Sequence, residues 1–217
     1  MFTGLIREVG IITSIRTQGE TAEIQIHAPK TAQEASLGDS IAVNGSCLTV
    51  SFLDQEVFHA DLSSETLRRT SFAEAHPGAA VNLEPSLRLA DKLGGHLVTG
   101  HVDGVGRIES IEGEGEFCQI TFSFPPRLAP YIAEKGSICI EGISLTVTFA
   151  IEEKAGVSII PTTLRDTNLG TKNPGDTINI EVDLIARYLE RLLTYKSGPS
   201  ELGLTFDKLR DYGFPVD

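Results

Sequence analysis

A thiol and a hydroxyl occupy equivalent places in a motif that occurs twice in this chain. Cys47 belongs to SIAVNGSCLTVSF, which begins at Ser40, and Ser144 belongs to SICIEGISLTVTF, which begins at Ser137. A cysteine thiolate is a nucleophile, and a serine hydroxyl donates and accepts hydrogen bonds. Free cysteine is also often a small buried hydrophobe, and Cys118 and Cys139, within strand-like runs, are expected to be that. The differences between the copies indicate where chemistry takes place.

Histidine supplies a second reactive group. His101 aligns with Leu5 of the first copy, and an imidazole with a pKa of about 6.5 suits proton transfer. His96, in GGHLVTGH, is expected to pack at the junction between the copies. Three other histidines belong to no motif: His27, His59 and His76. His101 is therefore a candidate for proton transfer at a position where the first copy has an apolar side chain.

Two further charged residues differ between the copies. Lys135 aligns with Gly38, and Asp183 aligns with Ser86. Lys135 lies in a predicted turn, where lysine is usually solvated. Asp183 precedes a predicted helix, which it can cap. Neither residue indicates a function without further information.

The duplication extends along most of the chain. VGIITSI from Val9 matches VGRIESI from Val105, and ETLRRTSF from Glu65 matches TTLRDTNL from Thr162. Matches in the same order, at offsets of 96 (105 − 9) and 97 (162 − 65) residues, indicate two domains of roughly a hundred residues each. We expect an N-terminal domain over 1–96, a C-terminal domain over 97–186 and a helical segment over 187–217.

Each copy consists mainly of short segments rich in β-branched residues. Ala22–Pro29 and its partner Cys118–Pro125 alternate apolar and polar residues, which is typical of half-buried strands. Turn sequences such as Asn173-Pro174-Gly175-Asp176 separate such segments. Short helices are expected at Pro29–Ala35 and Pro126–Glu134. Many short strands without alternating helices predict a small antiparallel barrel or sandwich in each copy.

The end of the chain follows a different pattern. After Asp183, apolar residues of DLIARYLERLLTYK recur on one face of a predicted helix that ends at Gly198-Pro199. The helix either packs on its own domain or mediates oligomerisation, and the pattern does not decide between them. LTFDKLRDYGF predicts a short final helix.

Composition excludes several classes of protein. The 217 residues carry a formal net charge of −12, which argues against a general nucleic-acid binder. No apolar run approaches the ~20 residues of a membrane span, and the first residues do not resemble a signal peptide. Three cysteines without CxxC spacing argue against a disulfide framework and a zinc site. We expect a cytoplasmic protein with no membrane contact.

Six segments together resemble the α-type riboflavin synthases: MFTGLIREVG, NGSCLTV, SSETLRRT, GGHLVTGHVDG, EGISLTV and PTTLRDTNLG. The resemblance covers the whole chain and is specific in order and spacing. It implies an all-β fold of two six-stranded antiparallel Greek-key barrels in tandem, with a C-terminal α-helix, assembled as a homotrimer. It implies a transferase that converts two molecules of 6,7-dimethyl-8-ribityllumazine into riboflavin and 5-amino-6-ribitylaminouracil, without a metal or redox cofactor. Association with lumazine synthase is a further expectation.

The resemblance also implies two equivalent pockets, shared between the N-terminal barrel of one subunit and the C-terminal barrel of its neighbour. The first is expected to be built from Gly4, Leu5, Ile6, Ser40, Cys47, Leu48, Thr49, Asp61, Leu62, Ser63, Ser64, Glu65 and Thr66, with Phe2 and Thr3 nearby. The second is expected to be built from Gly100, His101, Val102, Lys135, Ser144, Leu145, Thr146, Ile160, Pro161, Thr162, Thr163, Leu164 and Arg165. Hydroxyls, amides and carboxylates among them suit a polar heterocycle and its ribityl chain.

Catalytic roles follow from the same resemblance. Cys47 is expected to donate a hydrogen bond to a lumazine or to attack its C7 atom, and His101 to remove a proton from the 7-methyl group. Ser144 is expected in the equivalent pocket, with Asp183 orienting it, and Lys135 is expected to contact a pteridine carbonyl. Two rivals remain: a non-catalytic lumazine-binding antenna protein of the same fold, and a flavin-binding barrel of an oxidoreductase.

Overall fold

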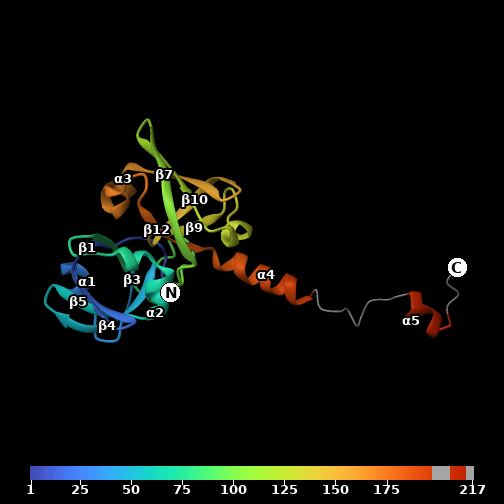
Figure 1. Ribbon diagram of the computed structural model, residues 1–217, viewed down its shortest axis with the longest axis horizontal. Coiled ribbons are helices and arrows are strands. Elements are labelled where there is room, and N and C mark those ends of the chain that lie inside the picture. Colours follow the sequence, from blue (N-terminus) through green and yellow to red (C-terminus); the bar gives the residue numbers. More distant parts are fainter. Residues whose placement is uncertain (197–205, 214–217) are drawn as a thin grey trace. The chain divides into compact units, whose positions relative to one another are not determined.

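Two closed β-barrels follow one another along the chain in the computed structural model, which describes residues 1–196 and 206–213 (Figure 1). Barrel 1 consists of β1 (Glu8–Gln18), β2 (Thr21–His27), β3 (Ser40–Val43), β4 (Ser46–Asp54), β5 (Val57–Leu62) and β6 (Ala80–Pro85). Barrel 2 consists of β7 (Gly104–Glu114), β8 (Phe117–Ser123), β9 (Ser137–Ile140), β10 (Ile143–Ile151), β11 (Lys154–Ile159) and β12 (Thr177–Val182). The predicted pair of six-stranded barrels is confirmed.

The two barrels share one topology. Strands neighbour each other as β1-β2-β5-β4-β3-β6 in the first and β10-β11-β8-β7-β12-β9 in the second, which is the same circular order. All these pairs are antiparallel. A register shift between Val50 and Phe52 in β4 recurs between Val147 and Phe149 in β10. Such bulges bend strands, which helps a small sheet to close on itself.

Alternation along the strands builds each barrel interior. In β2 the residues Ala22, Ile24 and Ile26 are buried, and their neighbours face outward. Strand β8 repeats this pattern with Cys118, Ile120 and Phe122. Each barrel therefore encloses its own apolar core.

Short helices connect the strands at equivalent places. The expected helices are present as α1 (Pro29–Glu34) and as the 3₁₀ helix η2 (Pro126–Tyr131). Two others, α2 (Ser64–Arg69) and α3 (Pro161–Asp166), follow β5 and β11, where the sequence indicated only binding segments. The 3₁₀ helices η1 (Ser71–Glu74) and η3 (Asn168–Thr171) come next.

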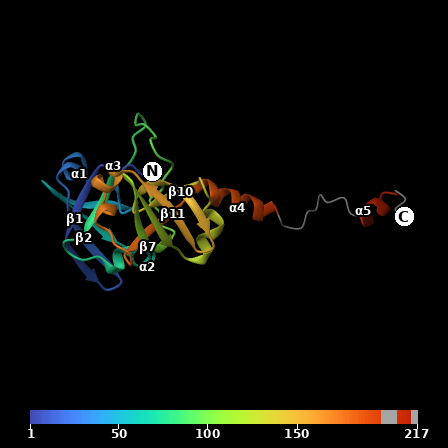
Figure 2. The ribbon, with the colours of Figure 1, turned by 90° about the horizontal axis from the view of Figure 1, so that it is seen from above.

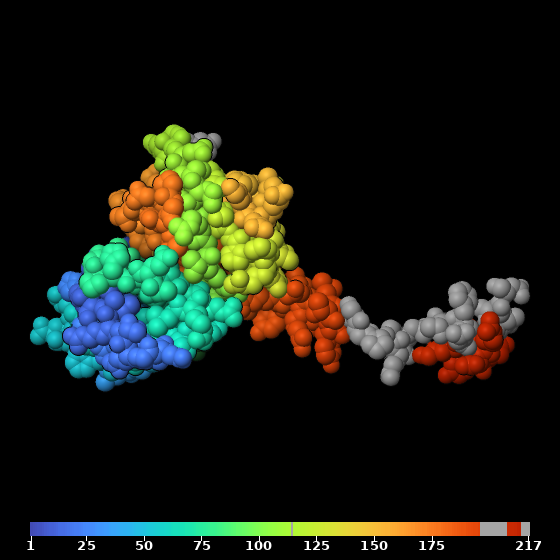
Figure 3. Space-filling model, in the orientation of Figure 1, coloured from blue at the N-terminus to red at the C-terminus, as the bar shows by residue number. Residues whose placement is uncertain are grey.

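The barrels contact each other directly, as the space-filling view shows (Figure 3). Phe2 and Val98, which align between the copies, form an isolated antiparallel bridge. They pack with Ala42, Cys139 and the half-buried Cys47 in a small apolar cluster. Corresponding residues thus meet across an approximate twofold axis.

A buried polar network completes this junction, and Figure 2 gives a second view of the barrels. Asn82 Nδ2 donates to the Glu141 carbonyl, and Asn179 Nδ2 donates to the Asn44 carbonyl, each at 2.9 Å. The Glu141 carboxylate is fully buried and lies 3.4 Å from Lys172 Nζ. Hydrogen bonding satisfies these buried groups and fixes how the barrels dock.

The predicted terminal helix is confirmed as α4 (Leu184–Lys196), and the final short helix as α5 (Phe206–Asp211). The predicted end of the helix that begins as α4, at Gly198-Pro199, lies outside the described residues. Met1–Leu184 forms one compact unit, and a second unit begins at Ile185. Within the described part of the chain, none of the helices combines the length and apolar content needed to cross a membrane.

Candidate active site

Two buried glutamates hold two corresponding loops in the same way. Glu84 on β6 accepts hydrogen bonds from Thr3 N, Thr3 Oγ1 and Gly4 N at 2.7, 2.6 and 2.9 Å. Glu181 on β12 accepts from Thr99 N, Thr99 Oγ1 and Gly100 N at the same three distances. Burial raises the pKa of Glu84, although hydrogen bonds from Thr3 and Gly4 oppose the shift. Each barrel thus fixes a Thr-Gly loop at the junction.

Each loop then lies against the other barrel. The Gly4 carbonyl accepts from Ser144 N on β10, and the Gly100 carbonyl accepts from Cys47 N on β4, both at 2.8 Å. From the sequence we expect Gly4 beside Cys47 and Gly100 beside Ser144, and the structure shows the opposite combination. The Phe2–Val98 bridge explains the exchange, because it carries each loop across the junction.

The close approach requires glycine in both loops. Gly4 and Gly100 have φ values of +75° and +80°, which favour glycine. A Cβ on Gly4 would lie 2.6 Å from Ser144 N, and a Cβ on Gly100 would lie 2.5 Å from Cys47 Cβ. Neither loop can carry a side chain without moving the reactive residue beneath it.

Ser144 has a partner that is not among the expected site residues. His96 Nδ1 lies 2.7 Å from Ser144 Oγ, within hydrogen-bond distance. Burial lowers the pKa of His96, while the negative charge of Asp183 acts in the opposite direction. Gly95 allows this approach, because a Cβ there would collide with the Thr3 carbonyl oxygen and Ser144. The Gly-Gly pair before His96 was the available sequence signal.

The residues around the exchanged loops divide into two half-sites. The Ser144 half-site comprises Ser144 and Thr146 on β10, the Gly4-Leu5 loop and His96. The Cys47 half-site comprises Cys47 and Thr49 on β4 and the Gly100-His101 loop. Cys47 is half-buried, whereas Thr49, Thr146, Leu5 and His101 are exposed. The main chain is therefore equivalent in the two half-sites, while the reactive side chains differ.

Comparison with known proteins shows the same duplication. A family profile described as "Lumazine binding domain" matches residues 3–86 and 99–183. A protein named riboflavin synthase from Actinobacillus pleuropneumoniae is 45% identical over 99% of this chain and 100% of its own length. Its namesake from Bacillus subtilis is 37% identical over 99% of this chain and 100% of its own length. The chain belongs to the riboflavin synthase family.

Solved structures of a related protein, LumP, contain bound ligands. LumP in complex with 6,7-dimethyl-8-(1′-D-ribityl) lumazine is 27% identical, with a TM-score of 0.77 over 84% of this chain and 99% of LumP. LumP complexes with riboflavin and with flavin mononucleotide give TM-scores of 0.79 and 0.76 at 28% identity. Both barrels of this riboflavin synthase family member thus have the fold of a lumazine-binding protein.

The segments after β5 and β11 carry polar side chains, and these two strands pair with β4 and β10, which carry Cys47 and Ser144. Ser63 caps α2 by accepting from Thr66 N, and Asp61 is exposed. Arg165 forms two 2.7 Å hydrogen bonds with Asp166 on α3. Within the predicted set, exposed or half-buried groups are Ile6, Ser40, Ser64, Glu65, Val102, Leu145, Ile160, Pro161, Thr162, Thr163 and Leu164.

Some predicted binding residues place their side chains in apolar clusters. Leu48 and Leu62 belong to the core of barrel 1, and Phe2 belongs to the cluster at the junction. Lys135 is exposed in its predicted turn, with φ of +63° and its N–H bonded to the Val147 carbonyl. Within residues 1–196 and 206–213, no group of three or more His, Cys, Asp or Glu side chains is placed to hold a metal ion.

Proposed function

We propose that this protein is a riboflavin synthase, a transferase that catalyses the dismutation of two molecules of 6,7-dimethyl-8-ribityllumazine. One lumazine donates a four-carbon unit to the other, so that riboflavin and 5-amino-6-ribitylaminouracil are formed. The observation that carries the proposal is the pair of half-sites: one backbone frame built twice, with Cys47 and His101 in one and Ser144 and Leu5 in the other. Identical molecules need equally shaped sites, and donor and acceptor need different chemistry.

The Ser144 half-site handles the proton of a lumazine 7-methyl group in this proposal. His96 is neutral near pH 7 because burial lowers its pKa, so Nδ1 can accept a hydrogen bond from the Ser144 hydroxyl. A hydroxyl held by a neutral imidazole can relay a proton to that imidazole. The Asp183 carboxylate then stabilises the imidazolium that forms. In this proposal Asp183 therefore acts on Ser144 indirectly, through His96.

The Cys47 half-site holds the second lumazine. Its thiol is half-buried beneath Gly100 and is proposed to donate a hydrogen bond to the ring or to attack C7. His101, on the exposed end of the same loop, is proposed as a proton-transfer group there, and Lys135 as a contact to a pteridine carbonyl of the lumazine in the Ser144 half-site. Stacking two lumazines in register would supply much of the remaining rate enhancement.

A lumazine-binding antenna protein is the second candidate, because solved structures of LumP with lumazine and with riboflavin share this fold. Two observations favour the enzyme. The relatives named riboflavin synthase are 37–45% identical over nearly the whole chain, against 27–28% for LumP. LumP also covers 84% of this chain, whereas the synthases cover 99%.

The deciding experiment is incubation of the purified protein with 6,7-dimethyl-8-ribityllumazine alone. We expect one riboflavin to appear for every two lumazines consumed, measured by absorbance and chromatography. Ser144→Ala is the matched inactive control, because it removes the proposed proton relay and leaves the barrels intact. Lumazine bound stoichiometrically without riboflavin formation would support the antenna protein instead.

The proposed assembly is a homotrimer whose interface includes α4. Ile185, Tyr188, Leu189, Leu192 and Leu193 of α4 are each more than half exposed in the single chain, which suits an oligomer contact. In this assembly a Cys47 half-site faces the Ser144 half-site of a neighbouring chain. Sedimentation analysis should give three chains per particle, and Leu192→Glu should give monomers that retain the barrels.

We further propose a cytoplasmic location and an association with lumazine synthase, which would deliver the substrate. The support is the predicted function, because both partners would handle the same lumazine. Co-sedimentation of the two purified proteins tests the association.

A further inference from the structure

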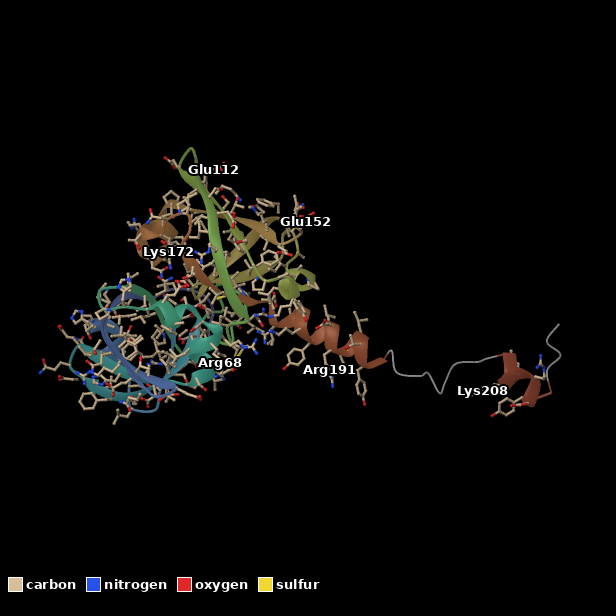
Figure 4. All side chains as sticks on the ribbon, viewed as in Figure 1. Arg68, Glu112, Glu152, Lys172, Arg191 and Lys208 are labelled. Atoms are coloured by element: carbon tan, nitrogen blue, oxygen red, sulfur yellow. The ribbon has the colours of Figure 1, made fainter. Side chains whose placement is uncertain are left out.

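An arginine-lined depression is formed by residues of α2, η2 and the start of β7, the strand that follows the Gly100-His101 loop of the Cys47 half-site. It has a volume of about 400 Å³ and is lined by Glu65, Arg68, Arg69, Gly104, Val105 and Arg127. Arg68 and Arg69 belong to α2, which begins within the segment Asp61–Thr66 that is expected to line the first pocket. Figure 4 labels Arg68. The Arg127 side chain donates to the carbonyl of Asp103, two residues after His101.

The charge of this depression contrasts with that of the whole protein. Three arginines and one glutamate give its lining a net charge of +2, in a chain whose formal net charge is −12. Glu65 accepts from Arg68 at 3.0 Å and from Arg69 at 2.8 Å, so one carboxylate orients two guanidinium groups. Oriented guanidinium groups suit a phosphate monoester, which they can bind through paired hydrogen bonds.

The equivalent place in the other repeat has no such excess. Alignment of the repeats replaces Arg69 by Asp166 and Glu65 by Thr162, while Arg68 becomes Arg165. Arg165 there is bonded to Asp166.

The strand beside the depression differs as well. Glu8, the first residue of β1, stands where β7 begins with Gly104. The Glu8 carboxylate accepts from Lys30 N and Thr31 N at the start of α1. In barrel 2 the Arg127 side chain instead lies close to Gly104, where an added Cβ would be 2.8 Å from a guanidinium nitrogen. Glycine at position 104 thus leaves Arg127 without a counterpart of the Glu8 carboxylate.

We propose that this depression binds the phosphate of a 5′-phosphorylated flavin whose ring occupies the Cys47 half-site. The inference rests on the proposed function, because it takes a flavin in that half-site as given. A ribityl chain that reaches Glu65 brings its terminal carbon next to Arg68 and Arg69. The phosphorylated flavin thus competes with lumazine at one half-site, while the Ser144 half-site binds phosphorylated and free flavins alike.

Quenching of flavin fluorescence by the full-length protein tests the proposal. Flavin mononucleotide should bind roughly tenfold more tightly than riboflavin at low salt, as charge-assisted hydrogen bonds predict. Added salt should reduce this ratio, since the arginines are exposed. The triple variant Arg68→Gln, Arg69→Gln, Arg127→Gln should bring the ratio to about one while riboflavin affinity stays unchanged. Equal affinities in the wild type would overturn the proposal.

Lys30→Gln is the matched control, because Lys30 occupies in α1 the place that Arg127 occupies in η2. It should leave the ratio at its wild-type value, and a loss equal to that of the triple variant would overturn the local assignment. Inorganic phosphate should compete with flavin mononucleotide and leave riboflavin bound, and failure to compete would contradict a phosphate subsite. Lumazine turnover, measured in parallel, separates the two proposals: riboflavin formation without a mononucleotide preference refutes the inference alone.

Discussion

The two half-sites differ in what surrounds an otherwise common frame. In both, a buried glutamate holds a Thr-Gly loop and the glycine carbonyl accepts from a strand of the other barrel. The Ser144 half-site adds a half-buried imidazole, and the Cys47 half-site adds a thiol and an exposed imidazole. The frame accounts for the equal shape of two sites for one compound. The reaction depends on the residues that the frame does not share.

Exchange of the loops makes each half-site a joint product of both barrels. A half-site cannot form within an isolated barrel, because its loop and its strand belong to different copies. The buried polar network at the junction also joins the two barrels, since Asn82 and Asn179 each donate a hydrogen bond to the opposite barrel. Both half-sites therefore depend on the way the two barrels dock.

Gly4→Ala and Gly100→Ala should give the largest effects, each in the half-site of the other barrel. A side chain at these positive-φ positions costs about 1–2 kcal/mol in backbone strain. The clash with Ser144 or Cys47 adds about 1–3 kcal/mol of overpacking. We expect riboflavin formation to fall by more than about 100-fold in both variants, with a lower free energy of unfolding by denaturant titration.

Proton resonances of the His96 imidazole distinguish the two variants. Gly4→Ala should shift them, because Gly4 packs on Ser144, and Gly100→Ala should leave them in place. Gly19→Ala is the control for strain alone, since Gly19 has φ of +63° and no atom within 4 Å of an added Cβ. The reverse pattern of shifts would refute the exchange of loops.

Ser144→Ala should give the next largest effect. Loss of a positioned proton-transfer group typically costs about 10²–10⁴-fold in rate, so kcat should fall within that range while KM changes little. Steady-state kinetics with lumazine measures both. A loss confined to KM would make Ser144 a binding residue and remove the chemical asymmetry of the half-sites.

The sequence predicted which residues of the two half-sites are equivalent far better than it predicted which of them lie together. Repeated motifs located equivalent residues, and alternation located the strands, because both are local properties. Equivalence does not say whether Gly4 contacts the strand of its own copy or of the other, since either choice satisfies the repeat. Contacts between distant residues decide it: the Phe2–Val98 bridge and the hydrogen bonds from Ser144 N to Gly4 and from Cys47 N to Gly100. His96 was missed for the same reason: its partner Ser144 is 48 positions away.

His96→Gln should have a smaller effect, with a signature in the pH profile. The lowered pKa keeps His96 neutral near pH 7, so kcat/KM should decline below pH ~6.5, as His96 becomes protonated. The free energy of unfolding should also decrease as the pH falls, because the unfolded state binds the proton more readily than the folded state. The stability that neutral His96 contributes is fully present above pH ~6.5, and it is lost as the pH falls towards the lowered pKa.

Two further variants test whether protonation of His96 causes the decline of kcat/KM at low pH, which is the acid limb of the profile. Asp183→Asn should move it to lower pH, because the Asp183 charge raises the pKa of His96. His101→Ala should lower kcat more than it alters KM and leave the limb in place. A limb that disappears with His101→Ala and persists in His96→Gln would assign the proton transfer to the other half-site.

Cys47→Ser should have the smallest effect, because it makes β4 match β10 at this position. The serine at position 144 shows that the frame accommodates a hydroxyl beneath a glycine carbonyl. Cys47 also packs against the apolar cluster of Phe2, Ala42, Val98 and Cys139, so a hydroxyl there should cost about 1 kcal/mol of stability. If the thiol acts as a hydrogen-bond donor, kcat should fall less than about tenfold. A loss above 10³-fold, approaching that of Ser144→Ala, would identify Cys47 as the nucleophile, since serine retains the donor and loses the thiolate.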